Sequence, residues 1–118
     1  MCPGLVVSGD EIGALGSGGS NRIRTAMLQV LSRRLLIGQS WQNAVSADRM
    51  HYENHKLVCE AGSAAGRECA DAFESGQTHV ARFPTKNMYF GGVHCAISIG
   101  GEPSGIGDTR RSGAVQRG

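Results

Sequence analysis

Residues 16–24, Gly-Ser-Gly-Gly-Ser-Asn-Arg-Ile-Arg, decide the fold, because a flexible glycine run there leads directly into a helix. The first turn of an α-helix has backbone N–H groups with no partner inside the helix. These groups and the helix dipole together favour negative charge at that end. In an enzyme that attacks carbonyl groups, the same arrangement would form an oxyanion hole. On spacing alone, a turn followed by a helix cap is the simpler interpretation.

The glycine run matches neither of two common phosphate-binding loops. No Gly-Lys-[Ser/Thr] follows it, as a Walker A loop requires, and its spacing differs from the dinucleotide fingerprint. Cysteines give no metal signal either, because none are paired as Cys-x-x-Cys. Cys59 and Cys95 lie in apolar, strand-like runs and are predicted to be buried free thiols. We therefore expect no cofactor and no metal.

Length and composition describe one globular domain over residues 1–118, with 40% hydrophobic and 19% charged residues. The net charge of +2 and the few aromatic residues argue against a nucleic-acid-binding surface. No stretch approaches the ~20 apolar residues of a membrane span, and no signal peptide is visible. The chain begins almost inside a predicted strand at Leu5–Val7, which leads us to expect that the sequence is truncated.

The first half of the chain predicts a hairpin followed by two helices. The helix after the glycine run is capped by Ser20 or Asn21 and extends to about Ile37. Its last residues, 35–37, are apolar all round and are predicted to be buried. The remaining expected elements are a hairpin of 5–7 with 11–15, a short helix over 40–47 packed by Trp41, Ala44 and Val45, and an irregular surface segment over 48–56.

The second half predicts four strands and one helix. The expected elements are a strand at 57–60, a linker at 61–66, a helix at 67–75, a strand at 78–83, a β-rich run at 88–99 and an edge strand at 106–110. The resulting order, ββααβαβββ, gathers the helices between sets of strands. This order predicts an α+β fold with a mainly antiparallel sheet rather than a doubly wound parallel one.

Other reactive side chains have simpler structural interpretations. His51 and His55 would share a helix face, but their polar segment favours a surface loop over a metal site. His94 alternates with apolar residues in a strand, which is typical of a core or interface histidine. Asp108 and Arg110 are interpreted as an ion pair at a sheet edge. No serine, threonine or cysteine has the sequence context of a nucleophile.

Several segments, read together, resemble the gamma-glutamyltranspeptidase family (glutathione hydrolases) of the N-terminal nucleophile hydrolase superfamily. Met1-Cys2-Pro3 matches the end of the family stretch Ser-Ser-Met-[Ser/Thr/Cys]-Pro. Residues 16–23 match Gly-Ser-x-Gly-Gly-Ser-Arg-Ile, followed by the helix Thr25–Leu31. Residues 44–51 resemble Ala-Val-x-Ala-Pro-Arg-x-His.

Two later segments continue the resemblance in the same order. Residues 87–94, Asn-Met-Tyr-Phe-Gly-Gly-Val-His, resemble a strand entry, and residues 105–113 resemble the closing Gly-x-x-Asp-Pro-Arg-x-Gly. The chain is therefore similar to the last part of the family's small subunit. The resemblance implies a partial αββα N-terminal nucleophile hydrolase sandwich. It also implies action on a γ-glutamyl substrate such as glutathione, by hydrolysis or by transfer to an amino acid or peptide.

In this family a freed N-terminal threonine is the nucleophile, and a Gly-Gly pair binds the oxyanion through backbone N–H groups. That pair maps to Gly18 and Gly19 if one residue is deleted here, and to Gly19 and Ser20 in an ungapped alignment. Asp48 and Thr109 replace two family prolines.

The family's nucleophile and its glutamate-binding groups would precede Met1, so this chain holds no nucleophile: Thr25 lies inside a helix without a free amine. We expect a fragment that is inactive alone and whose partner is the missing N-terminal half or large subunit. The resemblance does not fix the compartment, although family members are often periplasmic or at the cell surface. The alternatives are a non-catalytic binding or interaction module, a small structural domain without chemistry, and a fragment of a cephalosporin-acylase-like amidase.

Overall fold

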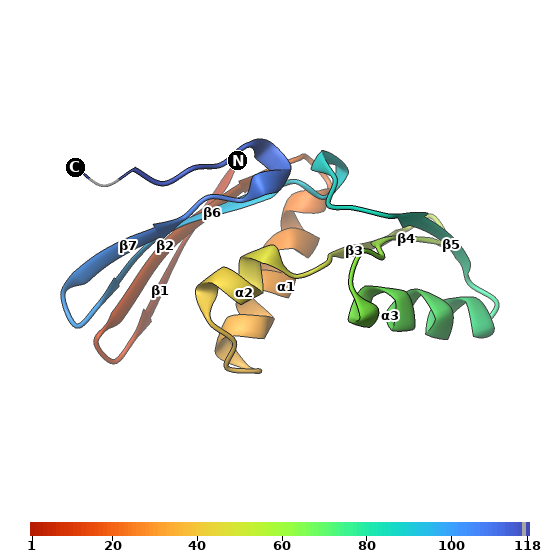
Figure 1. Ribbon diagram of the computed structural model, residues 1–118, viewed down its shortest axis with the longest axis horizontal. Coiled ribbons are helices and arrows are strands. Elements are labelled where there is room, and N and C mark those ends of the chain that lie inside the picture. The colour runs from red at the N-terminus through yellow and green to blue at the C-terminus, as the bar shows by residue number, and fades with distance from the viewer. Residues whose placement is uncertain (117) are drawn as a thin grey trace.

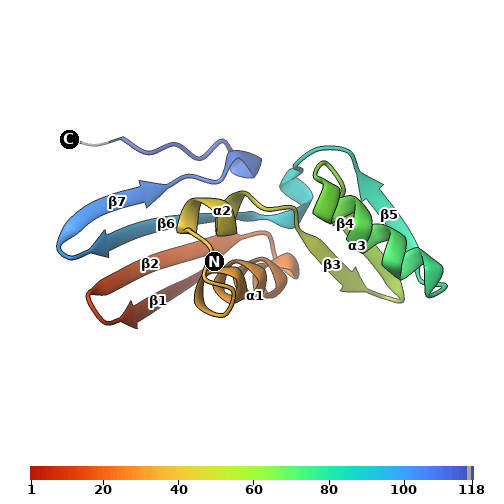
Figure 2. The same cartoon turned by 60° about the horizontal axis from the view of Figure 1, so that its bottom comes forward.

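The computed structural model describes residues 1–116 and 118, and its strands form two separate sheets (Figure 1). The molecule is elongated, with extents of 48 × 25 × 23 Å. A four-stranded sheet with α1 and α2 lies at one end, and a three-stranded sheet with α3 lies at the other (Figures 1 and 2). The glycine run therefore belongs to the larger end, where the chain passes from β2 into α1.

The four-stranded sheet is antiparallel throughout, in the order β1-β2-β6-β7. Both of its hairpins close with two-residue turns, as the glycines there allow. Gly100 and Gly101 between β6 and β7 both have positive φ, +57° and +83°, which glycine adopts without steric cost. The strands are β1 (Cys2–Ser8), β2 (Glu11–Gly18), β6 (Gly92–Ile99) and β7 (Glu102–Ile106).

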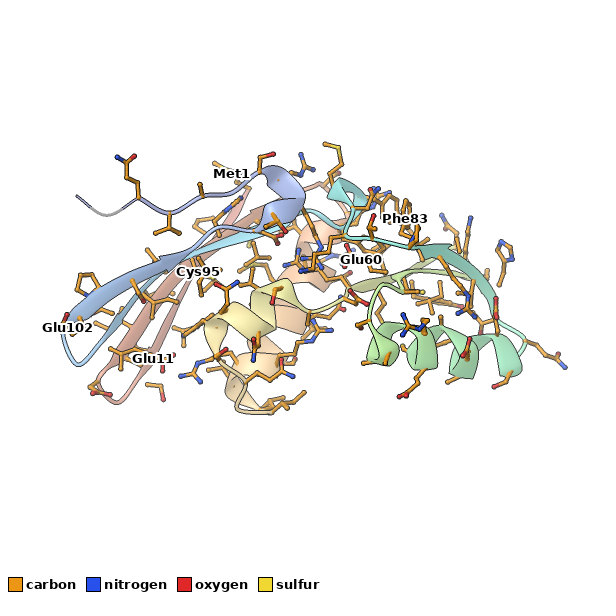
Figure 3. The ribbon with its side chains drawn as sticks, viewed as in Figure 1. Met1, Glu11, Glu60, Phe83, Cys95 and Glu102 are labelled. Carbon is orange, nitrogen blue, oxygen red and sulfur yellow. The ribbon has the colours of Figure 1, made fainter. Side chains whose placement is uncertain are left out.

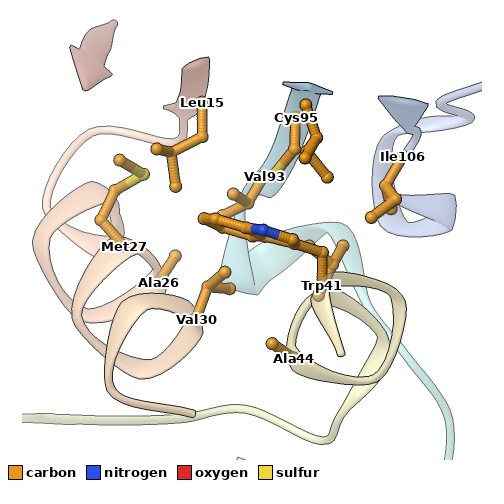
Figure 4. Close-up of a cluster of buried hydrophobic side chains, with 11 residues drawn as sticks. Leu15, Ala26, Met27, Val30, Trp41, Ala44, Val93, Cys95 and Ile106 are labelled. Atoms are coloured by element: carbon orange, nitrogen blue, oxygen red, sulfur yellow. The ribbon is translucent and has the colours of Figure 1, made fainter. Parts of the chain in front are cut away.

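Helices α1 (Arg22–Leu35) and α2 (Trp41–Ser46) cover one face of this sheet and form the main core with it (Figure 4). The Trp41 ring lies across the middle of that core, between strands and helices. Gly13 is needed opposite it, because an added Cβ would lie 2.9 Å from Trp41 Cζ2. Trp41 Nε1 donates to Glu11 Oε1 at 2.6 Å, so the buried indole N–H is satisfied.

The opposite face of the four-stranded sheet has no helix over it, and in the described chain only the C-terminal segment 113–116 lies against its β6–β7 side. Residues of β2 alternate between buried and exposed, which is the pattern of a sheet with one packed face. Leu5, Val7 and Ile12 lie on the open face, with 69%, 65% and 48% of their surface exposed. A groove of about 960 Å³ runs along this face between Gly16, His94 and the C-terminal segment.

The three-stranded sheet is mixed, in the order β3-β4-β5. β3 pairs antiparallel with β4, whereas β4 and β5 are parallel and are connected through α3. A parallel pair needs such a crossover, and a helix usually supplies it. The elements are β3 (Met50–Glu53), β4 (Lys56–Glu60), α3 (Ala64–Ser75), β5 (His79–Phe83) and the 3₁₀ turns η1 (Met88–Phe90) and η2 (Thr109–Arg111).

The predicted α+β class and mainly antiparallel pairing are confirmed, and most elements lie where expected. The irregular segment predicted over 48–56 is wrong, because Met50–Glu53 forms β3. The Gln29 side chain donates to the Met50 carbonyl at 2.7 Å and accepts from the Met50 N–H at 3.0 Å. It thus makes the same pair of hydrogen bonds to Met50 that a neighbouring strand would make. Such support from a distant helix is invisible in the local sequence.

Three further predictions need correction. Residues 35–37 are exposed by 50%, 84% and 68%, so the predicted burial of this apolar end of α1 is wrong. α3 begins at Ala64 rather than Arg67, because the Ser63 hydroxyl caps it by accepting from the Gly66 N–H at 3.0 Å. The last strand is 102–106 rather than 106–110, since the tight glycine turn returns the chain early and η2 follows.

Replacing Trp41 with Ala should lower the free energy of unfolding by about 3–5 kcal/mol, because a large buried ring is lost from the centre of the core. The matched control is Leu36→Ala, whose side chain is exposed, with an expected change within about 0.5 kcal/mol. Urea unfolding followed by circular dichroism measures both. Equal changes in the two variants would contradict the core described above.

Candidate functional site

The glycine junction between β2 and α1, residues 18–21, is where two strands and a helix converge. Gly18 ends β2 and pairs with Gly92 of β6. Gly19 follows with φ +139°, and a Cβ there would lie 3.1 Å from the Gly91 Cα. Gly91 has φ +71°, and its own added Cβ would lie 2.6 Å from the Gly18 carbonyl oxygen. Glycine is therefore needed on both sides of this close approach.

Backbone donors at the junction are left without internal partners. The carbonyl groups of Gly19 and Ser20 accept from the N–H groups of Arg22 and Ile23, at 3.3 and 3.1 Å. Within residues 1–116 and 118, the structure records no hydrogen bond from the N–H of Gly19, Ser20 or Asn21. The N–H groups of Gly19 and Ser20 are thus available to an acceptor outside the described chain.

The predicted N-cap of α1 is correct in position but makes no capping hydrogen bond. Asn21 is the N-cap by position, but its side chain makes no cap hydrogen bond, and the first turn holds no acidic residue. Ser20 instead adopts a left-handed conformation with φ +56°. The positive end of the α1 dipole is therefore not neutralised by α1 itself.

Arginine side chains surround the same junction. Arg22 places its guanidinium carbon 4.0 Å from the centroid of the Tyr89 ring. Arg111 Nη2 would lie 3.8 Å from a Cβ added to Gly19. The helix dipole and these two charges are positive, whereas the Glu53 carboxylate, which accepts from Asn21 Nδ2 at 3.2 Å, is the negative group beside the junction. The arrangement can hold an oxygen atom that carries or acquires negative charge.

A second feature is a buried cluster of four charged side chains, which we name the ion network: Arg49, Glu60, Asp108 and Arg110. Each is at most 6% exposed. Arg49 Nη2 lies 2.7 Å from Asp108 Oδ2, and Arg110 Nε donates to Glu60 Oε1 at 2.7 Å. Arg110 Nη1 lies 3.3 Å from Asp108 Oδ1, which joins the two pairs. Figure 3 shows Glu60 between the two ends of the molecule.

Backbone groups supply most of the remaining partners of the ion network, although Arg49 Nε has none among the described residues. Glu60 accepts from the N–H groups of Arg49 and Asn87, each at 2.9 Å, and Asp108 accepts from that of Val93 at 2.9 Å. Burial disfavours ionised Asp108, but the Arg49 charge and the N–H donors prevail, so the pKa of Asp108 is lowered. Burial and the neighbouring Arg110 lower the pKa of Arg49. The four charges cancel, which makes their burial tolerable.

A family model described as gamma-glutamyltranspeptidase matches residues 1–118, the whole sequence. The chain belongs to the gamma-glutamyltranspeptidase family. The resemblance that the sequence motifs indicated is therefore confirmed. No significant match was found among curated protein sequences. In addition, no helix of the described residues is long and apolar enough to cross a membrane.

Solved structures of other proteins share the fold. The transpeptidase enzyme CapD of Bacillus anthracis is 23% identical, with a TM-score of 0.83 over 100% of this chain and 70% of that chain. The gamma-glutamyltranspeptidase of Pseudomonas nitroreducens, complexed with L-DON, is 21% identical, with a TM-score of 0.81 over 99% and 61%. Cephalosporin acylase from Bacillus halodurans is 17% identical, with a TM-score of 0.73 over 89% and 22%. The expected N-terminal nucleophile hydrolase fold is confirmed.

The structure brings separate family-like segments together in the ion network. Segment 44–51 supplies Arg49, and segment 105–113 supplies Asp108 and Arg110. The predicted Asp108–Arg110 ion pair is present, but it is buried at the junction of the two sheets rather than at a sheet edge. Sequence reasoning did not identify Glu60 as their partner, although an acidic residue at the end of an apolar strand was a usable signal.

Asp48, which stands where the family has proline, has its own structural role. Its Oδ2 accepts from the N–H and the hydroxyl of Ser63, at 2.8 and 2.7 Å, and so fixes the start of α3. Burial alone would raise the pKa of Asp48, but these hydrogen bonds lower it. Its carbonyl also accepts from Arg33 Nη2 at 2.7 Å, which links this segment to α1.

The predictions for the cysteines are confirmed, whereas some of those for the histidines are wrong. His51 is 6% exposed in β3 rather than in a surface loop, whereas His55 is exposed in the turn after β3. His94 is exposed on the open face of the four-stranded sheet, so the core alternative is wrong, while the interface alternative stays a prediction. Cys59 and Cys95 are buried free thiols, as predicted. Burial raises the pKa of Cys95 to about 11, so it is an unreactive thiol at neutral pH.

Replacing Asp108 with Asn should lower the free energy of unfolding at pH 7 by about 3–5 kcal/mol, because Arg49 loses its buried counter-charge. Since the pKa of Asp108 is lowered in the folded state, its contribution is complete above the unfolded-state pKa of about 3.9 and is lost as pH falls through the folded value. The difference between wild type and variant should therefore stay constant from neutral pH to about pH 4 and shrink as the pH falls further.

Urea unfolding across that pH range measures the effect of Asp108→Asn. The control is Asp71→Asn, which removes the exposed ion pair with Arg82 and should change stability little at any pH. A difference between wild type and Asp108→Asn that stays constant down to acid pH would show that the Asp108 charge contributes no stability.

Proposed function

We propose that this chain supplies the oxyanion-binding part of a γ-glutamyltransferase or glutathione hydrolase that acts on γ-glutamyl amides such as glutathione. One observation carries the proposal: the N–H groups of Gly19 and Ser20 have no recorded partner in the described chain and lie at the positive end of the 14-residue helix α1. Membership in the gamma-glutamyltranspeptidase family supports the substrate class. The domain is then one part of a larger catalytic unit.

The geometry favours one of the two pairs of oxyanion donors that the sequence allows. Gly18 belongs to β2 and lies opposite Gly92 in the ladder with β6. Gly19 and Ser20 lie outside the strand, and both have positive φ, so their backbone departs from the sheet. We therefore choose Gly19 and Ser20, the pair of the ungapped alignment.

The chemistry would proceed through a negatively charged tetrahedral intermediate. When a nucleophile attacks the γ-carbonyl carbon, the carbonyl oxygen gains negative charge, and two N–H groups held in place by β2 and α1 would stabilise it. Because these donors are fixed before the reaction, they need no reorganisation at the transition state. A carbonyl oxygen in the ground state gains less from them, so the interaction favours the transition state.

The attacking group must come from polypeptide outside this sequence. In the proposal it is the free N-terminal threonine typical of the family, whose α-amine acts as base. Thr25 does not fit this role, because it lies in the first turns of α1 and its hydroxyl bonds to His51 Nδ1 at 2.8 Å. Without that threonine, the chain should show no turnover.

The reading frame upstream of the Met1 codon offers an inexpensive check of this arrangement. A frame that continues into a Ser-Ser pair and, further upstream, a Thr-Thr-His segment would support it. Cephalosporin acylase shares the fold, and an amidase of that kind would be distinguished by cleavage of a cephalosporin side-chain amide rather than of γ-glutamyl-p-nitroanilide. An interaction module would cleave neither after addition of the missing half.

The isolated chain should self-associate, because the open sheet face exposes Leu5, Val7 and Ile12. The double variant Leu5→Lys and Val7→Lys places charges on that face and should shift the chain toward monomer. Leu28→Lys, on the outer side of α1, is the control and should change little. Sedimentation velocity measures the effect. A monomeric wild-type chain with a sharp two-state melt would contradict a missing partner layer.

Reconstitution with a nucleophile-bearing half should restore cleavage of γ-glutamyl-p-nitroanilide. Replacing the Gly19 amide by an ester through chemical ligation removes its N–H and should then lower kcat by about 100-fold or more. Gly19→Pro would also remove the N–H, but proline cannot adopt φ +139°. An ester at Gly38, at the other end of α1, is the matched control and should be neutral. Unchanged turnover after the Gly19 substitution would place the oxyanion donors elsewhere.

A further inference from the structure

The first turn of α1 is held from the side by three contacts to elements far away in sequence. Thr25 Oγ1 lies 2.8 Å from His51 Nδ1 of β3. Asn21 Nδ2 donates to Glu53 Oε1 at 3.2 Å, and the Arg22 guanidinium lies 4.0 Å from the Tyr89 ring of η1. Together these contacts fasten the start of the helix to the smaller end of the molecule.

The Thr25–His51 contact is the most enclosed of the three. His51 is 6% exposed, and its ring meets the Tyr89 ring edge-on at 6.5 Å between centroids. The other ring nitrogen, Nε2, lies 3.5 Å from Glu53 Oε2. The imidazole therefore lies between a hydroxyl on one side and a carboxylate on the other. A Thr25 hydroxyl that donates to Nδ1 leaves the Nε2 proton facing Glu53.

This contact acts at the position where the glycine junction needs support. Gly19 and Ser20 have no side-chain anchor of their own, and their carbonyls bond only to the first turn of α1. The direction of their N–H groups thus depends on where that first turn lies, in addition to β2 on the other side. Thr25 lies one helical turn after Asn21, on the side that meets β3. A displacement of the turn would rotate the peptide groups before it.

We propose that Thr25 and His51 are positioning residues for the oxyanion donors: their hydrogen bond fixes the first turn of α1 so that the N–H groups of Gly19 and Ser20 converge on one point. The inference rests on the proposed function for its catalytic consequence, but not for its structural part. It also gives Thr25 a role other than that of nucleophile.

Thr25→Val and Thr25→Ser are the matched test, because the first removes the hydroxyl at nearly constant volume and the second keeps it. In the reconstituted enzyme, Thr25→Val should lower kcat about tenfold or more with little change in KM, since misplaced donors lose transition-state stabilisation. Thr25→Ser should restore most of kcat. A general loss of stability would instead lower the amount of active enzyme in both variants without this pattern.

A second measurement separates the inference from the proposed function. Amide hydrogen exchange of Arg22 and Ile23, whose N–H groups donate to the carbonyls of Gly19 and Ser20, and ¹⁵N chemical shifts of Gly19 and Ser20 report the junction directly in the full chain, without any activity. Faster exchange and shifted resonances in Thr25→Val, restored in Thr25→Ser, support positioning even if the Gly19 ester proves neutral and the proposed function fails. Unchanged exchange and shifts in Thr25→Val, or a kcat loss that Thr25→Ser fails to restore, would overturn the inference.

Discussion

The ion network of Arg49, Glu60, Asp108 and Arg110 is the constraint on which the rest of the structure depends. Its members come from the segment after α2, the end of β4 and the segment after β7, so they tie both sheets to one point. A buried charge without a partner is far more costly than a lost surface contact. The two ends of the molecule therefore cannot move relative to each other without exposing or separating these charges. Hydrophobic packing at the larger end alone would not impose this geometry.

The relative placement of the two sheets determines what surrounds the glycine junction. The larger sheet holds α1 through the core around Trp41 and Val30, whereas β3 and η1 reach the start of the same helix through His51, Glu53 and Tyr89. The helix start is thus held from two directions, and only one of them is hydrophobic. This explains how a glycine-rich stretch, which loses more conformational entropy on folding than other sequences, is kept in one conformation.

Local sequence patterns were sufficient to predict the parts of the fold that are determined by neighbouring residues in the chain. The hairpin turns, the apolar face of α1, the short helix α2 and the buried cysteines all follow from periodicity and turn chemistry. Prediction failed where the structure of a segment depends on a side chain far away in sequence. β3 depends on the Gln29 side chain, and the position of Asp108 and Arg110 depends on Glu60, 50 residues from Arg110 in sequence. For the candidate site, the sequence indicated the glycines, but only the fold distinguishes the N–H groups that leave the sheet from those within it.

The donors at the glycine junction also determine which kind of negative charge it would bind. A site for a permanent dianion would be expected to bring several cationic side chains directly onto the ligand. Here Arg22 is stacked on Tyr89 and Arg111 lies beside Gly19, so both charges flank the junction, while the donors without a recorded partner are neutral N–H groups. Neutral, fixed donors bind a carbonyl oxygen weakly and an oxyanion more strongly. In the proposed function, the junction therefore suits charge that appears during a reaction better than charge carried by a resting ligand, which is the property that an acyl-transfer site requires.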